Sequence, residues 1–387
     1  MIPDNSPSAC AVSPLDLASH PFRAQVRTAL EEAVLPHAET WEQQGHIPAE
    51  GWRALADAGL FGLAAGGPGF AKSAILLEEL GRTGFAGVRA AVSVHAYMAS
   101  SYIDRFGTVM QQEKYLPAVR TGSRVGALAL SEQDAGTALD GITTRAEPDG
   151  TGGYRVKGRK LHVANGSQAG FYICLVRLRD IAGRPRTLAG CGLLIIDADT
   201  PGVSAHPEPM LGWRAADVCT ITLDDVHVPG DRLIGKASRT LSYLMAALDF
   251  ERLVAGLLAV GGADHCMGVT GAFVRTHRIG EAPLATHQAV RHALADLTAE
   301  LDLVRAYAHR AVILHTQDRL DTRTASVLKL RATELAVVAA RACMQYHGAL
   351  GYLDDSVPAR IYRDAVAGTV TAGASELMRD LIFEAAD

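Results

Sequence analysis

The spacing of hydrophobic residues changes twice along the chain, and this change constrains the fold most strongly. Residues from about 21 to 121 have helical periodicity with no alternating strand pattern. From about 125 to 235 the apolar runs are short, rich in β-forming residues and separated by turn residues. Long stretches rich in Ala and Leu follow. The sequence predicts an α+β multidomain protein, with an N-terminal helical domain (1–121), a middle antiparallel, barrel-like β domain (122–236) and a C-terminal helical bundle (237–387).

Composition limits the compartment and the partners. The 387 residues are 48% hydrophobic, which is enough for a large core in two or three domains. The net charge is −5 without any long basic run, which argues against nucleic acid or an anionic membrane as a partner. The longest apolar run, 253–260, is less than half of the ~20 residues that span a bilayer. The polar N-terminus (1–11) lacks a secretion-signal pattern. We expect a cytoplasmic protein.

The cysteines show no metal-ligand spacing. There is no CxxC pair, and thiols scattered along a long chain are typical of a reducing compartment. We therefore expect buried free thiols and no metal site. The six are Cys10, Cys174, Cys191, Cys219, Cys266 and Cys343.

Five short segments contain the residues best suited to binding or chemistry. In the first, a predicted strand ends and turns through Gly136, and the hydroxyls of Ser131 and Thr137 are available as donors. Taken alone, this segment is weak evidence and is better explained by an ordinary strand followed by a turn. The five are ALALSEQDAGT (127–137), VKGRKLHVANG (156–166), LGWRAAD (211–217) with LDDVHVP (223–229), QYHGALGY (345–352) and YRDA (362–365).

Together and in this order, the five segments resemble the signatures of the acyl-CoA dehydrogenase family over essentially the whole chain. The resemblance implies a helical domain, a β domain and a four-helix bundle, usually in a homotetramer with FAD at the subunit boundaries. A homo-oligomer, either a dimer or a tetramer, is therefore expected. The resemblance also implies a flavin-dependent oxidoreductase that acts on a small-molecule acyl thioester.

The same resemblance assigns cofactor contacts to particular residues. Leu130 and Ser131 would contact the pyrimidine side of the flavin, and Gly136 and Thr137 its polar stem. Gln345 and Gly348 would contact the ADP half of a cofactor held by the neighbouring subunit.

The family's pyrophosphate-binding segment is altered here. It corresponds to residues 275–284, with Arg278 as its arginine and Gln288 as the later glutamine, and it lacks the usual aromatic residue. FAD is the expected cofactor, and FMN stays open. The residues fit equally well an Arg278 that is only a solvated loop charge.

Two flavin contacts of the family are replaced. His162 stands where a tryptophan usually covers the ring, and Ala164 stands where a hydroxyl usually donates to N5. A histidine can pack on a ring and titrates near neutral pH. The alternative is an ordinary half-buried strand histidine.

The family's catalytic glutamate is also missing. The segment TAGASE (371–376) places Ala372 where the family has the residue that abstracts the α-proton of the thioester. The backbone N–H of Ala372 could still donate to the thioester carbonyl, because a main-chain donor does not depend on the side chain.

A replacement base is present in the first helix of the predicted bundle. Glu251 falls on the apolar stripe of that helix, where burial should raise the pKa of its carboxyl, as a general base requires. The segment 248–253 also resembles the minority of the family, including isovaleryl-CoA dehydrogenases, that carries the glutamate on this helix. The resemblance assigns Arg252 to the substrate. A buried ion pair of Glu251 with a basic neighbour is the structural alternative.

Three hypotheses about function follow. The first is α,β-dehydrogenation of an acyl thioester bound to CoA or to an acyl carrier protein, with an electron-transfer partner. The second is a flavin monooxygenase of secondary metabolism that uses O₂ and flavin reduced by a separate reductase. The third is a flavin-poor relative with a binding role.

Overall fold

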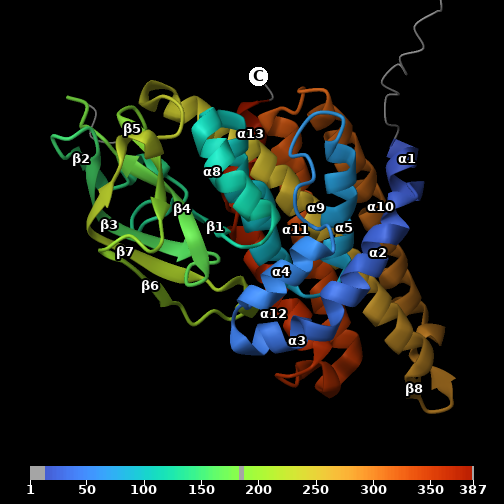
Figure 1. The fold of residues 1–387 in the computed structure, drawn as a ribbon. Helices are drawn as coiled ribbons and strands as arrows, with labels where there is room; N and C mark the ends of the chain where they lie inside the picture. Colours follow the sequence, from blue (N-terminus) through green and yellow to red (C-terminus); the bar gives the residue numbers. More distant parts are fainter. Residues whose placement is uncertain (1–13, 183–186, 386–387) are drawn as a thin grey trace, which may run out of the picture.

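The computed structural model describes residues 14–182 and 187–385, and Figure 1 shows the predicted order of helices, sheet and helices. This confirms the α+β fold class. The domain boundaries at 121 and 236 stay predictions. The polar N-terminal segment (1–11), with Cys10, lies outside the described residues. The N-terminal helices are α1 (Pro14–Ser19), α2 (Phe22–Ala33), α3 (Leu35–Gln44), α4 (Ala49–Asp57), α5 (Phe70–Arg82), α6 (Ala86–Ser93), the π-helix η1 (Val94–Ala99), α7 (Ser100–Phe106) and α8 (Val109–Arg120).

A curled seven-stranded sheet follows. Strands β3, β7 and β6 pair antiparallel, as do β2 with β3 and β4 with β5, which agrees with the predicted pattern. In addition, β1 and β2 each pair with β4 in parallel, a feature that hydrophobic alternation does not reveal. The strands are β1 (Val125–Ala129), β2 (Arg145–Pro148), β3 (Tyr154–Val163), β4 (Ala169–Arg177), β5 (Cys191–Asp197), β6 (Val203–Pro207) and β7 (Cys219–Val228).

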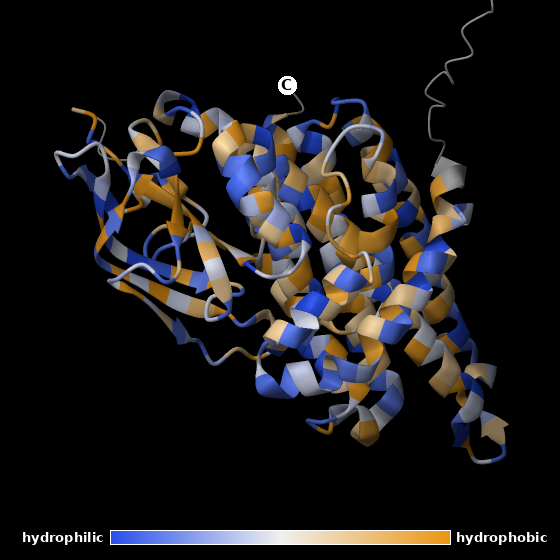
Figure 2. Cartoon of the chain, viewed as in Figure 1, coloured by the Kyte–Doolittle hydropathy of each residue, from blue (hydrophilic) through white to orange (hydrophobic). Residues whose placement is uncertain are grey.

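The C-terminal part is a bundle of long helices. They are α9 (Thr240–Thr276), α10 (Gln288–Thr316), α11 (Thr322–His347), α12 (Val357–Val370) and α13 (Ser375–Glu384), with a small hairpin, β8 (Arg278–Ile279) and β9 (Ala282–Pro283), between α9 and α10. Hydrophobic residues gather where these helices face one another (Figure 2). No helix in the described ranges is long and apolar enough to cross a membrane. The five described cysteines are buried free thiols, as predicted.

Two hydrogen-bonded side chains join the first strand of the sheet to the helices. The Nδ1 atom of His95 accepts from the backbone N–H of Gly126 at 3.0 Å, and its Nε2 lies 3.1 Å from the carbonyl of Val119. Asn165 donates to the carbonyls of Ala91 and Gly126. Because both ring nitrogens of the buried His95 are used and burial lowers its pKa to about 4, this histidine stays neutral and fixes the start of β1.

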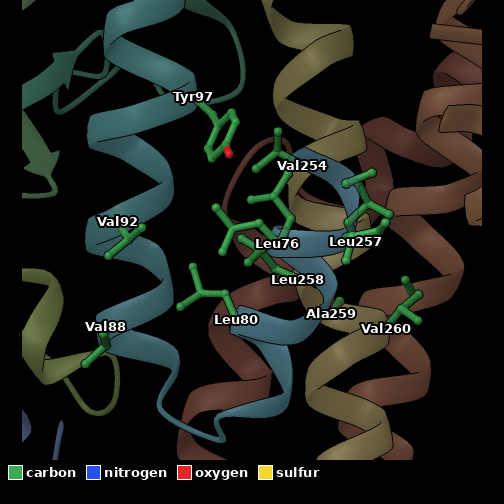
Figure 3. Close-up of a cluster of buried hydrophobic side chains, with 14 of the residues drawn as sticks. Leu76, Leu80, Val88, Val92, Tyr97, Val254, Leu257, Leu258, Ala259 and Val260 are labelled. Atoms are coloured by element: carbon green, nitrogen blue, oxygen red, sulfur yellow. The ribbon is translucent and has the colours of Figure 1, made fainter. Parts of the chain in front are cut away.

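The helical domain packs on the bundle through a close crossing of α5 and α9. Leucines of α5 interlock there with leucines and valines of α9, among them Leu80 and Leu258 (Figure 3). Gly81 and Gly261 allow the two backbones to approach, since a Cβ at Gly261 would lie 2.0 Å from the carbonyl oxygen of Glu78. This crossing fixes the position of α9 along its own axis relative to the helical domain.

Substituting alanine for two glycines of α9 tests this crossing. Gly261→Ala should lower the free energy of unfolding by about 1–3 kcal/mol or more, because the helices must move apart. Gly268→Ala is the matched control, since a Cβ there meets no atom within 4 Å, and it should raise stability by about 0.5–1 kcal/mol. Urea unfolding of both variants provides the measurement, and equal effects would contradict the close crossing.

Candidate active site

The structure brings the β-domain residues assigned to the flavin together where strands β1 and β3 end. We call this region, with Leu130, Ser131, Gly136, Thr137, His162 and Ala164, the flavin edge. The backbone N–H of Leu161 donates to the carbonyl of Ser131 at 3.0 Å, which holds the strand of His162 against the end of β1. The fully buried Nζ of Lys160 donates to the carbonyl of Leu130 at 3.0 Å and to Glu132 Oε1 at 2.8 Å.

Glu132 fixes the loop that follows β1. Its carboxylate also accepts from the backbone N–H groups of Thr143 and Thr144, at 2.6 and 3.0 Å. Burial raises the pKa of this carboxyl, but Lys160 and the hydrogen bonds outweigh that effect and lower it to about 2. Lys160 and Glu132 were not among the predicted site residues. The sequence feature that could have indicated this pair is a lysine at an inward-facing position of a strand.

The loop leaves its polar groups free for a ligand. Among the described residues, the hydroxyls of Ser131 and Thr137 have no hydrogen-bond partner, and a Cβ on the exposed Gly136 would meet no atom. Ala164 is half-buried and carries no side-chain donor. The arrangement can supply hydroxyl and main-chain donors to a polar ring edge, although not through residue 164.

His162 extends from this edge in an unusual backbone conformation. It has a φ of 57° beside a register shift in β3, and its side chain is 66% exposed. Its Nδ1 lies 2.6 Å from Glu208 Oε2, and its backbone N–H donates to Oε1. The side chain is more exposed than the alternative of a half-buried strand histidine expects, and contact of His162 with the flavin stays a prediction. Glu208 was not predicted, because nothing in its local sequence indicates the contact.

Glu251 lies on α9 inside the protein, with 4% of its surface exposed. The hydroxyl of Tyr102, from α7, donates to its Oε1 at 3.1 Å. Among the described residues no basic side chain forms an ion pair with it, so the structural alternative of a buried salt bridge is not what the structure shows. Burial raises the pKa of Glu251 to about 7, partly offset by Tyr102 and by the charge of Arg252.

Arg252 is buried and engaged with its own helix. Its guanidinium pairs with Asp249 at 2.7 Å, and the hydroxyl of Thr322 donates to the other oxygen of Asp249. Its Nε has no partner among the described residues. Contact of Arg252 with a substrate stays a prediction.

Ala372 lies in a tight turn between α12 and α13. Its φ of 53° is the left-handed conformation, which costs an alanine about 1–2 kcal/mol. Lys329 of α11, fully buried, donates from Nζ to the carbonyls of Thr369 and Gly373 on either side of the turn. Among the described residues the N–H of Ala372 has no acceptor, so it is available to a ligand.

The remaining predicted residues lie elsewhere. They are Arg278 in β8, Gln288 at the start of α10, Gln345 in α11 and Gly348 at its end, and all four are exposed. Tyr346 packs there with residues of α9 and α10, which keeps the group together. Figure 1 places β8 at the end of the bundle opposite to the β domain. One chain therefore does not bring these residues to the flavin edge.

Comparison with known proteins decides the family. Models of the acyl-CoA dehydrogenase N-terminal, middle and C-terminal domains match residues 18–123, 127–226 and 241–386. The chain belongs to the acyl-CoA dehydrogenase family. Members of this family are FAD-dependent oxidoreductases.

Individual relatives align over most of the chain. A mouse (Mus musculus) long-chain specific acyl-CoA dehydrogenase is 30% identical and covers 93% of this chain and 84% of its own length. A rice (Oryza sativa) isovaleryl-CoA dehydrogenase is 28% identical, with 93% and 89% covered. The crystal structure of an acyl-CoA dehydrogenase from Geobacillus kaustophilus has a TM-score of 0.89, 30% identity, and 96% and 98% covered.

The donors present fit the family's cofactor. The free hydroxyls of Ser131 and Thr137 suit the polar edge of a flavin, and the guanidinium of Arg278, unpaired among the described residues, suits a pyrophosphate. The backbone of Gly136 is open to close approach. The set is incomplete in one chain, because Arg278 lies at the far end of the bundle.

The pKa of Glu251 predicts how stability depends on pH. A folded-state pKa of about 7 lies above the unfolded value of ~4.3, so the folded protein binds the extra proton and loses stability as pH rises between these values. Glu251→Gln should remove this loss, on the order of 3 kcal/mol by pH 8. Tyr102→Phe should enlarge it, since Tyr102 stabilises the ionised form.

Urea unfolding at several pH values between 4 and 8 measures these differences. Glu376→Gln, on the exposed face of α13, is the control and should follow the wild type. Parallel curves for Glu251→Gln and wild type would contradict a raised pKa for Glu251.

Proposed function

We propose that the protein dehydrogenates an acyl thioester between its α and β carbons, with Glu251 as the base that takes the α-proton. The observation that supports this most strongly is a buried carboxylate without a cation partner among the described residues. A carboxylate removed from water holds a proton more tightly, so it accepts one from a weak carbon acid more readily than an exposed carboxylate does.

Tyr102 positions this base. Its hydroxyl occupies one lone pair of Oε1 at 3.1 Å and leaves Oε2 without a partner among the described residues. One cluster of buried residues contains Leu130, Tyr102 and Ala247. Ala247 lies one helical turn before Glu251 on α9. The base and the flavin edge thus border the same apolar region, which would exclude water from the reacting carbons.

The free N–H of Ala372 would bind the thioester carbonyl. A hydrogen bond there stabilises the negative charge that the oxygen gains as the α-proton leaves. The fixed turn between Thr369 and Gly373 pre-orients this donor. The substitution of glutamate by alanine removes the family's usual base at 372 and keeps the main-chain group.

FAD would be held by residues of two chains. Leu130, Ser131, Gly136 and Thr137 would bind its flavin half, with His162 and Ala164 near the ring. The residues at the far end of the bundle, namely Arg278, Gln288, Gln345 and Gly348, would reach its ADP half from a neighbouring subunit. When bound there, the flavin would supply the acceptor for the β-hydride. A homo-oligomer, a dimer or a tetramer, follows from this arrangement.

The acyl group would be carried by CoA or by an acyl carrier protein, and the electrons would leave through an electron-transfer partner. A second function, flavin monooxygenation in secondary metabolism, is favoured by Ala164 and Ala372. Neither a hydroxyl near N5 nor a base at 372 is needed where oxygen, rather than a thioester, reacts with reduced flavin.

Glu251→Gln tests the proposed base. The amide cannot accept the α-proton, so the rate of flavin reduction by acyl thioesters in the absence of air should fall by several orders of magnitude. The variant should still bind FAD and thioester. Glu376→Gln should retain the wild-type rate. Near-normal reduction by Glu251→Gln would exclude the base assignment.

The same assay separates the alternatives. A panel of acyl-CoA and acyl-carrier thioesters should reduce the bound flavin without NADH. If turnover instead needs NADH, a flavin reductase and O₂, the monooxygenase is correct. Purified protein that binds no flavin would favour a binding role.

Lys329→Met tests the turn at Ala372. Without the two hydrogen bonds from Nζ the turn loses its orientation, and turnover should fall about tenfold to a hundredfold, less than the 10²–10³ that loss of a whole oxyanion donor costs. Ala372→Gly is the control, because it keeps the N–H and suits the left-handed conformation. Steady-state kinetics should show it within a few-fold of wild type. Equal losses would contradict the donor role.

A further inference from the structure

The pair of His162 and Glu208 has features that a surface ion pair does not need. The backbone of His162 is left-handed at a register shift of β3, a conformation unfavourable for a residue with a Cβ. Both Glu208 oxygens bind this one residue, at 2.6 Å from the ring and 3.1 Å from the backbone N–H. Thr220 adds a third hydrogen bond to the carboxylate at 2.9 Å.

These contacts fix the tautomer of the ring. Burial raises the pKa of Glu208, but the hydrogen bonds from His162 and Thr220 outweigh it and lower the pKa, so the carboxylate stays ionised. An ionised carboxylate only accepts hydrogen bonds, so Nδ1 carries a proton. Nε2 is then the atom that gains or loses a proton, and it has no partner among the described residues.

The ring lies beside the residues assigned to the flavin. Leu161, the preceding residue, is hydrogen-bonded to Ser131. By contrast, His95 uses both ring nitrogens inside the protein and stays neutral. His162 therefore has a ring nitrogen available to a ligand beside the residues assigned to the flavin.

We propose that Glu208 orients His162 so that its Nε2 holds a proton against the bound flavin and stabilises the negative charge that the flavin gains on reduction. This rests on the proposed function, since it requires a flavin at this edge. A hydride from the substrate delivers two electrons and one proton to the flavin. The second proton comes from solvent and stays on Nε2, so no further reactant is needed.

Other charged groups near His162 are accounted for on each neighbouring element. On β3 and the loop after β1, Lys160 is paired with Glu132, while Arg159 and Asp134 are exposed. Between β6 and β7, Asp217 accepts from Ser167 and Gln168. His206, on β6, is exposed, and Cys219, on β7, is a buried thiol whose pKa is raised. Glu208 is the carboxylate that contacts the ring.

Titration of the histidine signals by NMR in the FAD-loaded enzyme tests the proposal. The signal of His162, assigned by its loss in His162→Gln, should show a proton affinity about tenfold or more higher in the reduced than in the oxidised enzyme. Glu208→Gln should lower the proton affinity of His162 in both states. An unchanged affinity on reduction, or no effect of Glu208→Gln, overturns the proposal.

Flavin reduction equilibria provide the reciprocal measurement. Coupling between two sites acts equally in both directions. From pH 9 to pH 6, the equilibrium constant for flavin reduction should therefore increase at least tenfold more in the wild type than in His162→Gln. Glutamine keeps a donor but cannot titrate. His227→Gln is the matched control, since His227 forms a similar pair with Asp149 at 2.9 Å on the same domain, and it should behave as wild type. No difference between His162→Gln and wild type overturns the proposal.

The outcomes separate this inference from the proposed function. If His162 responds to reduction while Glu251→Gln still turns over, only the base assignment fails. If Glu251→Gln is inactive and His162 does not respond, only the histidine inference fails. A protein that binds no flavin overturns both.

Discussion

The proposed chemistry depends most on the burial of one carboxylate, Glu251, that has no cationic partner among the described residues. Burying an ionisable group unpaired is costly, and Glu251 meets this cost by holding a proton more tightly and by one hydrogen bond from Tyr102. The adjacent charge is paired, because Arg252 forms an ion pair with Asp249 on the same helix. The protein therefore keeps the cation from the carboxylate, although the two residues are adjacent. This separation is what makes Glu251 suited to accept a proton.

The sequence predicted the parts of this arrangement that local patterns encode. Helical periodicity placed Glu251 on the buried stripe of α9, and the short apolar runs from about 125 to 235 indicated the β domain. Contacts between distant segments left no such pattern. Tyr102 lies 149 residues before Glu251, and Glu208 lies 46 residues after His162. The parallel pairing of β1 with β4 likewise depends on how the chain returns to the sheet, which the pattern of either strand alone does not show.

The cofactor assignment shows a second limit of local patterns. The motif around Ser131 and the motif around Gln345 are each recognisable in the sequence. The structure places the first in the β domain and the second with the residues near β8, at the end of the bundle opposite to the β domain. A single chain therefore supplies the flavin edge and, separately, a set of exposed donors including Arg278. Under the proposed binding of FAD, the two sets would be completed only between copies of the chain. Their separation is the observation that supports the proposed oligomer.

Ala372 and His162 share a left-handed backbone conformation. Ala372 retains a left-handed turn that glycine would adopt without strain, and Lys329 holds this turn from a fully buried position. The conformational strain at this alanine has an explanation if the backbone N–H, rather than the side chain, is the functional group. His162 repeats the pattern, because its left-handed backbone is fixed by Glu208. At both positions a left-handed backbone is held by a buried or ionised partner, and a polar group is left without a partner among the described residues. Strain that is supported by a dedicated partner is therefore the structural observation on which both proposals rest.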